Sequence, residues 1–182
     1  MTRLMLKELP RYDCLMEMAR KYPQLNPSAC EAFLNLLRVG DEVFRVGNEF
    51  FAKHNISQGR FLVLMLLSDC GSEGPVLHTP AELAEKACCT RATMTGLIDT
   101  LERDGMVRRE QNPEDRRMQH VTLTESGAAF LHSILPTHFE RITDLMSLLS
   151  EAECRILVGL LSKVIERAGT LGRQSDVPQA ET

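Results

Sequence analysis

Two adjacent arginines, Arg116 and Arg117, are the side chains best suited to chemistry in this sequence, because they follow Asp115 in a turn-forming segment. Their planar cations suit phosphates or a narrow, electronegative DNA minor groove. The Asn112-Pro113 pair just before them disfavours helix and promotes a turn. The segment therefore predicts an arginine-bearing hairpin tip. The alternative is an ordinary hairpin with solvated charges.

Short β-favouring runs lie on both sides of this turn, at residues 107–110 and 119–123. Their alternation lets Val107, Val121 and Leu123 face inward while the neighbouring side chains face water. The two runs predict a β-hairpin, to which residues 76–78 are expected to add a short strand. The apolar side chains would hold the hairpin against a core and leave its tip exposed.

A pair of helices is expected directly before the hairpin. Thr79 and Glu82 form a capping box, which predicts a short helix. Thr90 is the expected cap of a second helix, running from residue 91 to about residue 103 and stopped by Gly105. Two helices joined by a tight turn and followed by a hairpin predict a winged helix-turn-helix. The second helix of such a unit lies in the DNA major groove.

The face of this second helix opposite its apolar stripe carries the candidate DNA contacts. Arg91 can read a guanine through two hydrogen bonds, and Thr93 and Thr95 can bond to either base type or pack on a thymine methyl. The helix N-terminus at Thr90 offers backbone N–H groups to a phosphate. The alternatives are a simple cap for Thr90 and a solvated charge for Arg91.

The net charge argues against an indiscriminate nucleic-acid binder, since 21 Lys and Arg against 25 Asp and Glu leave a total of -4. Attraction to DNA therefore has to come from where the charges point. We expect the acidic side chains to turn away or pair. Such a binder is selective and salt-sensitive. The basic side chains expected to converge on DNA are Arg91, Arg108, Arg109, Arg116 and Arg117.

The run from residue 79 to residue 127, with Thr-Pro-Ala-Glu-Leu-Ala, Asp-Arg-Arg and Val-Thr-Leu-Thr-Glu-Ser-Gly, resembles the multiple antibiotic resistance regulator (MarR) family. The resemblance is strong over this run and weaker but consistent over residues 29–161. It implies a homodimeric transcriptional regulator, with repression the expected mode and activation the alternative. Such a regulator binds a pseudo-palindromic operator on double-stranded DNA and releases it when a small molecule or an oxidant arrives.

The resemblance also implies roles for the wing. Asp115 is expected to order the loop by pairing with a basic side chain, while Arg116 and Arg117 divide between the minor groove and supporting salt bridges. Arg91 departs from the family, because many members carry a small residue or proline there. The base preference therefore need not follow that of any relative.

The fold class expected is mainly α with a small β-hairpin wing (α+β), flanked by helices for dimerisation. The flanking helices carry more apolar surface than a small DNA-binding unit can cover, so residues 4–25 and 142–165 are the candidate dimer interface; the alternative is that both ends fold back on their own chain. The expected parts are N-terminal helices (1–56) for dimerisation and part of an effector cleft, the DNA-binding domain (57–124), C-terminal dimerisation helices (125–168) and a disordered tail (169–182).

An effector cleft is implied by the resemblance, between the long first helix, the next helix and the DNA-binding lobe. The expected effector is an aromatic or other organic acid. Each lining residue has the alternative of being core or solvated surface. By approximate alignment the lining residues are Phe44, Asn48, Phe51, His54 and Phe61, with Arg45 as the partner of an anionic ligand.

The six cysteines contain no paired CxxC motif and are expected to be reduced. Some members of the resembling family sense peroxide through a cysteine near the N-terminus, which makes Cys14 the candidate for a redox-sensing alternative. The scattered histidines predict no metal site, and no cofactor is expected.

Two other function classes compete with a regulator. An enzyme is not expected, because no motif fixes a Cys-His geometry and no Gly-rich phosphate loop is present. A winged-helix module that binds protein instead of DNA is disfavoured by the retained Arg91, Arg116 and Arg117. No apolar run has the length of a membrane span and the N-terminus lacks the apolar stretch of a signal peptide, so a cytoplasmic protein without a membrane partner is expected.

Overall fold

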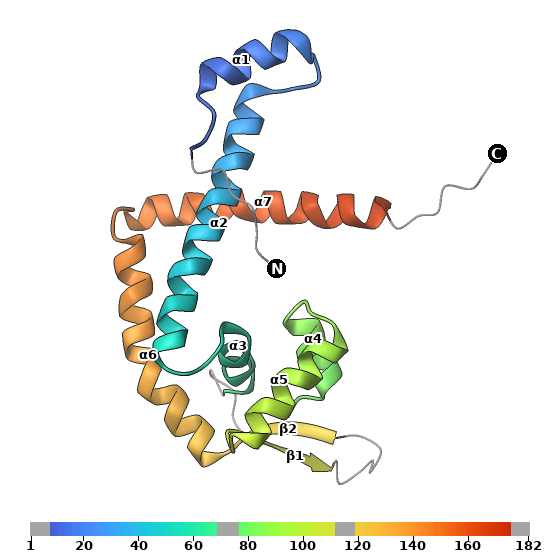
Figure 1. The fold of residues 1–182 in the computed structure, drawn as a ribbon, viewed down its shortest axis with the longest axis vertical. Helices are drawn as coiled ribbons and strands as arrows, with labels where there is room; N and C mark the ends of the chain where they lie inside the picture. The colour runs from blue at the N-terminus through green and yellow to red at the C-terminus, as the bar shows by residue number, and fades with distance from the viewer. Residues whose placement is uncertain (1–7, 69–76, 112–118, 176–182) are drawn as a thin grey trace, which may run out of the picture. The chain divides into compact units, whose positions relative to one another are not determined.

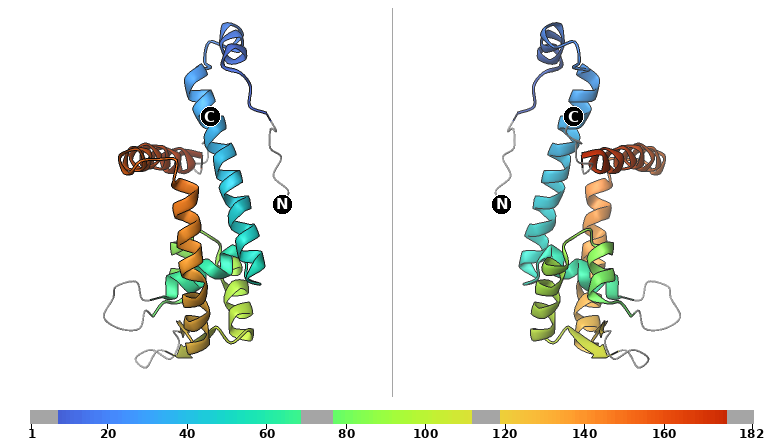
Figure 2. Two further views of the ribbon diagram at one scale, coloured as in Figure 1. Left: turned by 90° about the vertical axis from the view of Figure 1, so that its left-hand side faces the viewer. Right: turned by 90° about the vertical axis from the view of Figure 1, so that its right-hand side faces the viewer.

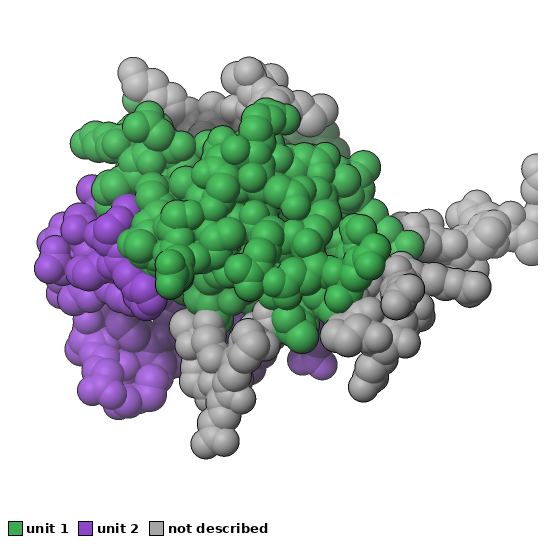
Figure 3. Space-filling model, turned by 90° about the horizontal axis from the view of Figure 1, so that it is seen from below, with its two compact units in different colours: residues 1–131 green, residues 132–182 purple. Residues whose placement is uncertain are grey.

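The computed structural model describes residues 8–68, 77–111 and 119–175, with the backbone alone for residues 172–175. The chain divides into two compact units, residues 1–131 and 132–182, which Figure 3 colours separately. The predicted fold class is confirmed, since the described chain is mostly helical with a small antiparallel hairpin (Figure 1). The elements are α1 (Tyr12–Lys21), α2 (Pro27–Lys53), α3 (Gln58–Leu67), α4 (Pro80–Lys86), α5 (Arg91–Arg103), β1 (Val107–Gln111), β2 (Gln119–Leu123), α6 (Glu125–Met146) and α7 (Glu151–Ser175).

The core of the first unit gathers the apolar faces of α3, α4, α5 and the hairpin. Each of these helices places its large aliphatic side chains at helical spacing, so one stripe of each turns inward. Burying several such side chains, at about 1.5 to 3 kcal/mol each, provides the main stabilisation of this unit. The side chains excluded from solvent include Val63, Leu64, Leu83, Met94, Ile98, Leu101, Val107, Val121 and Leu131.

The hairpin pairs β1 with β2 in the antiparallel register Val107 with Leu123 through Gln111 with Gln119. The predicted inward side chains are confirmed, since Val107 and Val121 are buried and Leu123 is half-buried, but Thr122, expected to face water, is buried as well. The strand expected at residues 76–78 is present as a single bridge, in which Val121 N donates to the carbonyl of His78 at 2.8 Å. Val76 lies outside the described residues.

The imidazole of His78 lies between the hairpin and α4. Lys86 Nζ donates to His78 Nε2 at 2.9 Å, and the side chain is only 14% exposed. Burial first, and the nearby charges of Lys86 and His120 in addition, lower the pKa of His78, while Glu82 opposes them. A lowered pKa means that the folded state favours the neutral imidazole.

We expect His78 to make the first unit less stable in mild acid. Its neutral form contributes stability that is complete above the ordinary pKa of histidine and is lost as the pH falls toward the lowered folded pKa. Chemical denaturation of the wild type and of His78→Gln, between about pH 8 and pH 5, measures this contribution. The variant should lose less stability on acidification than the wild type. An identical pH dependence of the two proteins would contradict the assignment.

Helix α2 is long and continuous (Figure 2), but only its C-terminal end reaches the core. Phe50 and Phe51 are buried, whereas Phe33 and Phe44 are more than half exposed, at 57% and 56%. The N-terminal half of α2 is covered in part by α1, where Leu15 is buried and the Tyr12 hydroxyl lies 3.2 Å from the hydroxyl of Ser28. The remaining apolar stripe of α2 faces solvent in a single chain.

The second unit contains the rest of α6 and α7. Pro136 lies inside α6, so the helix continues through it. A capping box starts α7, because Ser150 N donates to Glu153 Oε2 at 2.8 Å and Glu153 N donates to Ser150 Oγ at 3.3 Å. Most apolar side chains of α7 are exposed, among them Ile156, Val158, Leu160, Val164 and Ile165.

The first half of the predicted C-terminal tail is part of a helix. Helix α7 continues through Ser175, so residues 169–175 of the expected disordered tail are helical. A helix already nucleated over several turns adds one hydrogen bond for each further residue, which allows it to extend past the last apolar position. Residues 176–182 lie outside the described part of the chain.

Candidate DNA interface

Two helices and a tight turn place α5 on the surface of the first unit. The capping box of α4 is complete: Glu82 N donates to Thr79 Oγ1 at 3.3 Å, and Thr79 N donates to Glu82 Oε2 at 2.8 Å. Helix α4 ends in a turn, in which Cys88 has φ 48° and Cys89 N donates to the carbonyl of Ala84 at 3.0 Å. This is the hydrogen-bond pattern of a Schellman motif, with a cysteine in place of the usual glycine.

The start of α5 is the one predicted. Thr93 N donates to Thr90 Oγ1 at 3.1 Å, which confirms Thr90 as the N-cap. The cap satisfies one N–H group of the first turn and leaves others available to an anion such as a phosphate. Because α4 ends in a tight turn directly before Thr90, the helix pair has the connection of a helix-turn-helix.

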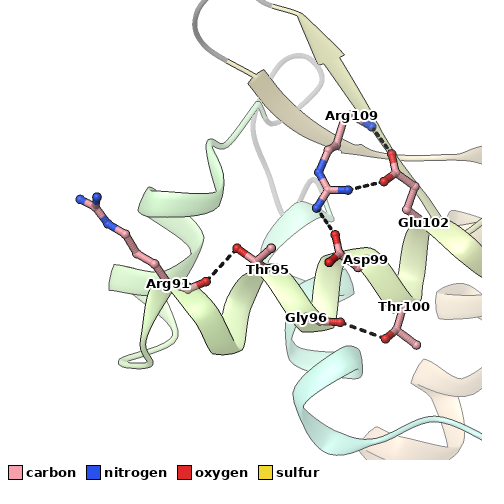
Figure 4. Close-up of polar contacts among 7 residues, drawn as sticks. All are labelled: Arg91, Thr95, Gly96, Asp99, Thr100, Glu102 and Arg109. Carbon is pink, nitrogen blue, oxygen red and sulfur yellow. Dashed lines mark hydrogen bonds and ion pairs between the residues drawn. The ribbon is translucent and has the colours of Figure 1, made fainter.

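The two faces of α5 separate as expected from its periodicity. Met94, Ile98 and Leu101 are fully buried. Arg91 and Thr95 lie on the exposed face, and the Arg91 side chain extends away from the helix (Figure 4). Within the part of the chain that the structure describes, no hydrogen bond or ion pair holds this guanidinium. Arg91 is therefore available to an external acceptor.

The hydroxyl groups of the two candidate threonines already have partners. Thr95 Oγ1 donates to the carbonyl of Arg91 at 2.9 Å, and Thr93 Oγ1 lies 2.9 Å from Thr90 Oγ1. A threonine hydroxyl has one proton and two lone pairs. Thr95 can thus offer a DNA base its lone pairs or its methyl group while keeping the bond to the helix carbonyl. Of the base contacts expected from the sequence, Thr95 therefore keeps those in which it accepts a hydrogen bond or packs its methyl group.

Two further arginines predicted to converge on DNA are instead paired within the chain. Arg108 pairs with Glu110, and Arg109 pairs with both Asp99 and Glu102 (Figure 4). Strand alternation explains why the two arginines pair with different elements. Arg109 is on the same side of β1 as the buried Val107 and pairs with α5, while Arg108 is on the other side. The expected convergence of all five arginines is therefore wrong for Arg109, whose side chain turns back to α5.

The tip of the predicted wing is not part of the described chain. Asp115, Arg116 and Arg117 belong to residues 112–118, which lie outside the described residues. The strands on either side of them end at Gln111 and Gln119, which are paired with each other. The predicted roles of the three tip residues remain predictions.

A junction after β2 holds α5, the hairpin and the start of α6 together. Thr124 N donates to the carbonyl of Met106 at 3.1 Å, and Thr124 Oγ1 donates to the carbonyl of Gly105 at 2.6 Å. Gly105 has φ 70°, and Met106 N donates to the carbonyl of Leu101 at 2.9 Å, which makes the end of α5 a second Schellman motif. A Cβ at Gly127 would lie 2.0 Å from the Met106 carbonyl oxygen, so only glycine fits there.

Comparison with known proteins agrees with this geometry. A family model described as the MarR family matches residues 56–118. The chain is 37% identical over 162 residues to the HTH-type transcriptional repressor YetL of Bacillus subtilis, covering 89% of this chain and 95% of that protein. The chain belongs to the MarR family.

Solved MarR-family structures share this fold. The structure of a MarR mutant from E. coli complexed with operator DNA is 28% identical, with a TM-score of 0.62, and covers 71% of this chain and 89% of that chain. A structure of Bordetella bronchiseptica BpsR, described as regulated in DNA binding by 6-hydroxynicotinic acid, is 24% identical with a TM-score of 0.62 over 71% of this chain and 89% of that chain. MarR-family membership makes this chain a DNA-binding transcriptional regulator.

Membrane insertion finds no support in the helices of residues 8–68, 77–111 and 119–175, none of which is both long and apolar enough for a span.

The predicted effector residues of this MarR-family chain separate into two groups. Phe51 and Phe61 are buried, with ring centroids 4.5 Å apart, and form part of the core. The ring of His54 lies 4.5 Å from that of Phe50, and its Nδ1 is 3.0 Å from the Phe50 carbonyl oxygen. Phe51 and Phe61 therefore meet where α2 packs against α3, whereas His54 contacts Phe50 at the end of α2.

The other predicted effector residues lie on exposed positions of α2. Phe44 and Asn48 are both exposed. Arg45 donates to Glu42 at 2.9 Å and to Glu49 at 2.7 Å, and these acids raise its pKa. An anionic ligand would have to compete with both carboxylates. A role for Arg45 in binding an anion remains a prediction.

Cys14 is a free, exposed thiol on α1. It borders a surface hollow that none of the predicted effector residues lines. The hollow is formed by Cys14, Glu17, Met18, Arg20 and Lys21.

Proposed function

We propose that this MarR-family regulator is a homodimeric repressor that binds a pseudo-palindromic operator and releases it when a small organic acid binds. The observation that carries the proposal is the exposed face of α5, which bears Thr95 and Arg91, whose guanidinium extends away from the helix (Figure 4) and has no hydrogen bond or ion pair to the described residues. A helix with this face fits the major groove as the second helix of a helix-turn-helix. The similarity to the transcriptional repressor YetL supports repression as the mode of action.

Dimerisation is supported by apolar surface that a single chain leaves uncovered. The apolar side chains of α7 are exposed, as are Met16 and Tyr22 on and after α1 and Phe33 on α2. A helix that leaves several large apolar side chains exposed in this way is typical of an association site. Two copies would present two α5 helices about one DNA turn apart, roughly 34 Å, which is the spacing of a palindromic operator. A regulator of chromosomal DNA acts in the cytoplasm.

Selection from a random duplex library tests this proposal. The wild-type protein should enrich a sequence with two inverted half-sites and bind it as a dimer, measured by electrophoretic mobility and by light scattering. Recovery of no preferred sequence at moderate salt would reject operator binding. If the chain bound another protein but no duplex, the alternative of a winged-helix module that binds protein instead of DNA would be favoured.

The wing carries the second part of the proposal. Replacing Arg116 and Arg117 together with alanine should weaken binding to the selected duplex and to variant duplexes alike, because minor-groove and phosphate contacts read little sequence. Fluorescence anisotropy titrations measure both affinities. Lys53→Ala is the control: it removes one exposed cation at the C-terminal end of α2, outside the DNA-binding domain and the candidate dimer interface, and should leave the affinity unchanged. An unaltered affinity of the double variant would remove the wing from the proposal.

An aromatic acid as effector is supported by the similarity to Bordetella bronchiseptica BpsR, whose DNA binding is regulated by 6-hydroxynicotinic acid. The exposed phenyl ring of Phe44 on α2 provides apolar surface for such a ligand, and the neighbouring Arg45 provides a cation for which the ligand competes with Glu42 and Glu49. A panel of aromatic carboxylic acids, screened for release of the selected duplex and for thermal stabilisation, tests this part. Release by none of them would leave DNA binding intact and reject the effector class.

A further inference from the structure

The guanidinium of Arg109 connects the first strand of the wing to the helix proposed to read DNA. Arg109 N donates to Glu102 Oε1 at 3.1 Å, and its guanidinium donates to Glu102 Oε2 and to Asp99 Oδ1 (Figure 4). One arginine thus satisfies two carboxylates of α5. Their spacing of three residues places both on the same side of the helix.

The environment of this network makes it more than a solvated surface pair. The Arg109 side chain is 23% exposed, against 49% for Asp99 and 37% for Glu102. The hydrogen bond that Arg109 donates to Asp99 is the largest cause of its raised pKa. Forked hydrogen bonds from arginine are directional as well as strong, so they fix orientation in addition to neutralising charge.

The position of Asp99 connects the network to DNA binding. Asp99 is four residues after Thr95 and eight after Arg91, which places it along the same exposed side of α5. A carboxylate there would repel the phosphates that flank a major groove. Pairing with Arg109 offsets that repulsion without any contact between Arg109 and DNA.

We propose that Arg109 is a positioning residue for DNA binding, which neutralises Asp99 and Glu102 and holds β1 against α5. The inference rests on the proposed function, because it concerns how α5 is presented to an operator. It differs from a phosphate contact in one testable respect. The effect of removing Arg109 should depend on whether the two acids are present.

A double-mutant cycle tests this dependence, with the duplex selected by the wild-type protein as the probe. Arg109→Met should weaken binding about tenfold at low salt in the native background. In a background carrying Asp99→Asn and Glu102→Gln, the same change should weaken it less than about threefold. Arg108→Met is the matched control. It removes the same charge from the opposite side of β1, and its effect should be equal in both backgrounds.

Varying the salt concentration distinguishes an electrostatic effect of Arg109 on DNA binding from a structural one. Repulsion by exposed acids is screened, so the loss caused by Arg109→Met should shrink as salt increases. Melting temperatures of the free proteins show whether each variant is folded. If Arg109→Met does not fold, Arg109→Lys replaces it. Lysine keeps the charge without the fork, and its smaller loss should disappear in the same acid-free background.

Three results would overturn the inference. Equal losses in both backgrounds would identify Arg109 as a direct DNA contact. A loss that persists undiminished at high salt would assign it a purely structural role. A wild-type protein without sequence preference would reject both this inference and the proposed function, whereas the first two results leave the proposed function standing.

Discussion

Gly127→Ala should destabilise the first unit by about 3 kcal/mol, at the upper end of overpacking effects, and abolish operator binding at temperatures where the wild type is folded. The added methyl group would lie 2.0 Å from the Met106 carbonyl oxygen, inside any allowed contact distance. The obstacle is backbone, and Met106 is itself held by hydrogen bonds to Leu101 and Thr124. Relief therefore requires moving either the start of α6 or the end of α5.

Gly96→Ala is the matched control for this change. Gly96 lies within α5, and a Cβ there would meet nothing within 4 Å. Because alanine is favoured over glycine inside a helix, this variant should gain about 0.5 to 1 kcal/mol. Urea denaturation of both variants gives the two free energies with their signs. A midpoint for Gly127→Ala equal to that of the wild type would show that the junction can relax.

Local signals made much of the fold predictable. The capping box at Thr79, the N-cap at Thr90 and the αL glycine at Gly105 are each decided by residues close in sequence. Periodicity likewise predicted which side of α5 is buried. These features needed no knowledge of distant partners. The end of α7 was harder to predict, because a formed helix can extend past its last apolar residue.

Two contacts near the candidate site were not predicted from the sequence, because they depend on tertiary structure. The close approach of Gly127 to Met106 joins two segments that the sequence does not relate. The pairing of Arg109 with Asp99 spans a helix end and a turn. The alternation of β1 was a usable signal for it, since Arg109 shares the side of the buried Val107.

The charge balance of the chain acquires a physical explanation from these pairs. The acidic total left open which arginines could attract DNA. Arg60 donates to Asp104 at 2.8 Å, and Arg108 and Arg109 are held by acids of β1 and α5. Several arginines near α5, the helix proposed to contact the operator, thus form ion pairs within the protein. Arg91, whose guanidinium makes no hydrogen bond or ion pair to another described residue, is consequently the arginine of α5 best placed to read a base.

Arg91→Ala should therefore relax base preference at one position of each half-site by about 1 to 3 kcal/mol, the range of a lost bidentate contact to guanine. Affinity for the selected duplex should fall, while affinity for a duplex already changed at that position should fall much less. Competition titrations against single-base-pair variants measure this difference directly.

Two variants separate base reading by Arg91 from its charge. Arg91→Lys keeps the cation but lacks the planar fork, so it should lose most of the base preference and retain more of the general affinity than alanine. Arg103→Ala removes an exposed arginine from the other end of α5 and should leave base preference unaltered. If Arg91→Ala lowers affinity equally for every duplex, Arg91 contacts the DNA backbone, and sequence reading must rest on Thr95 and its neighbours.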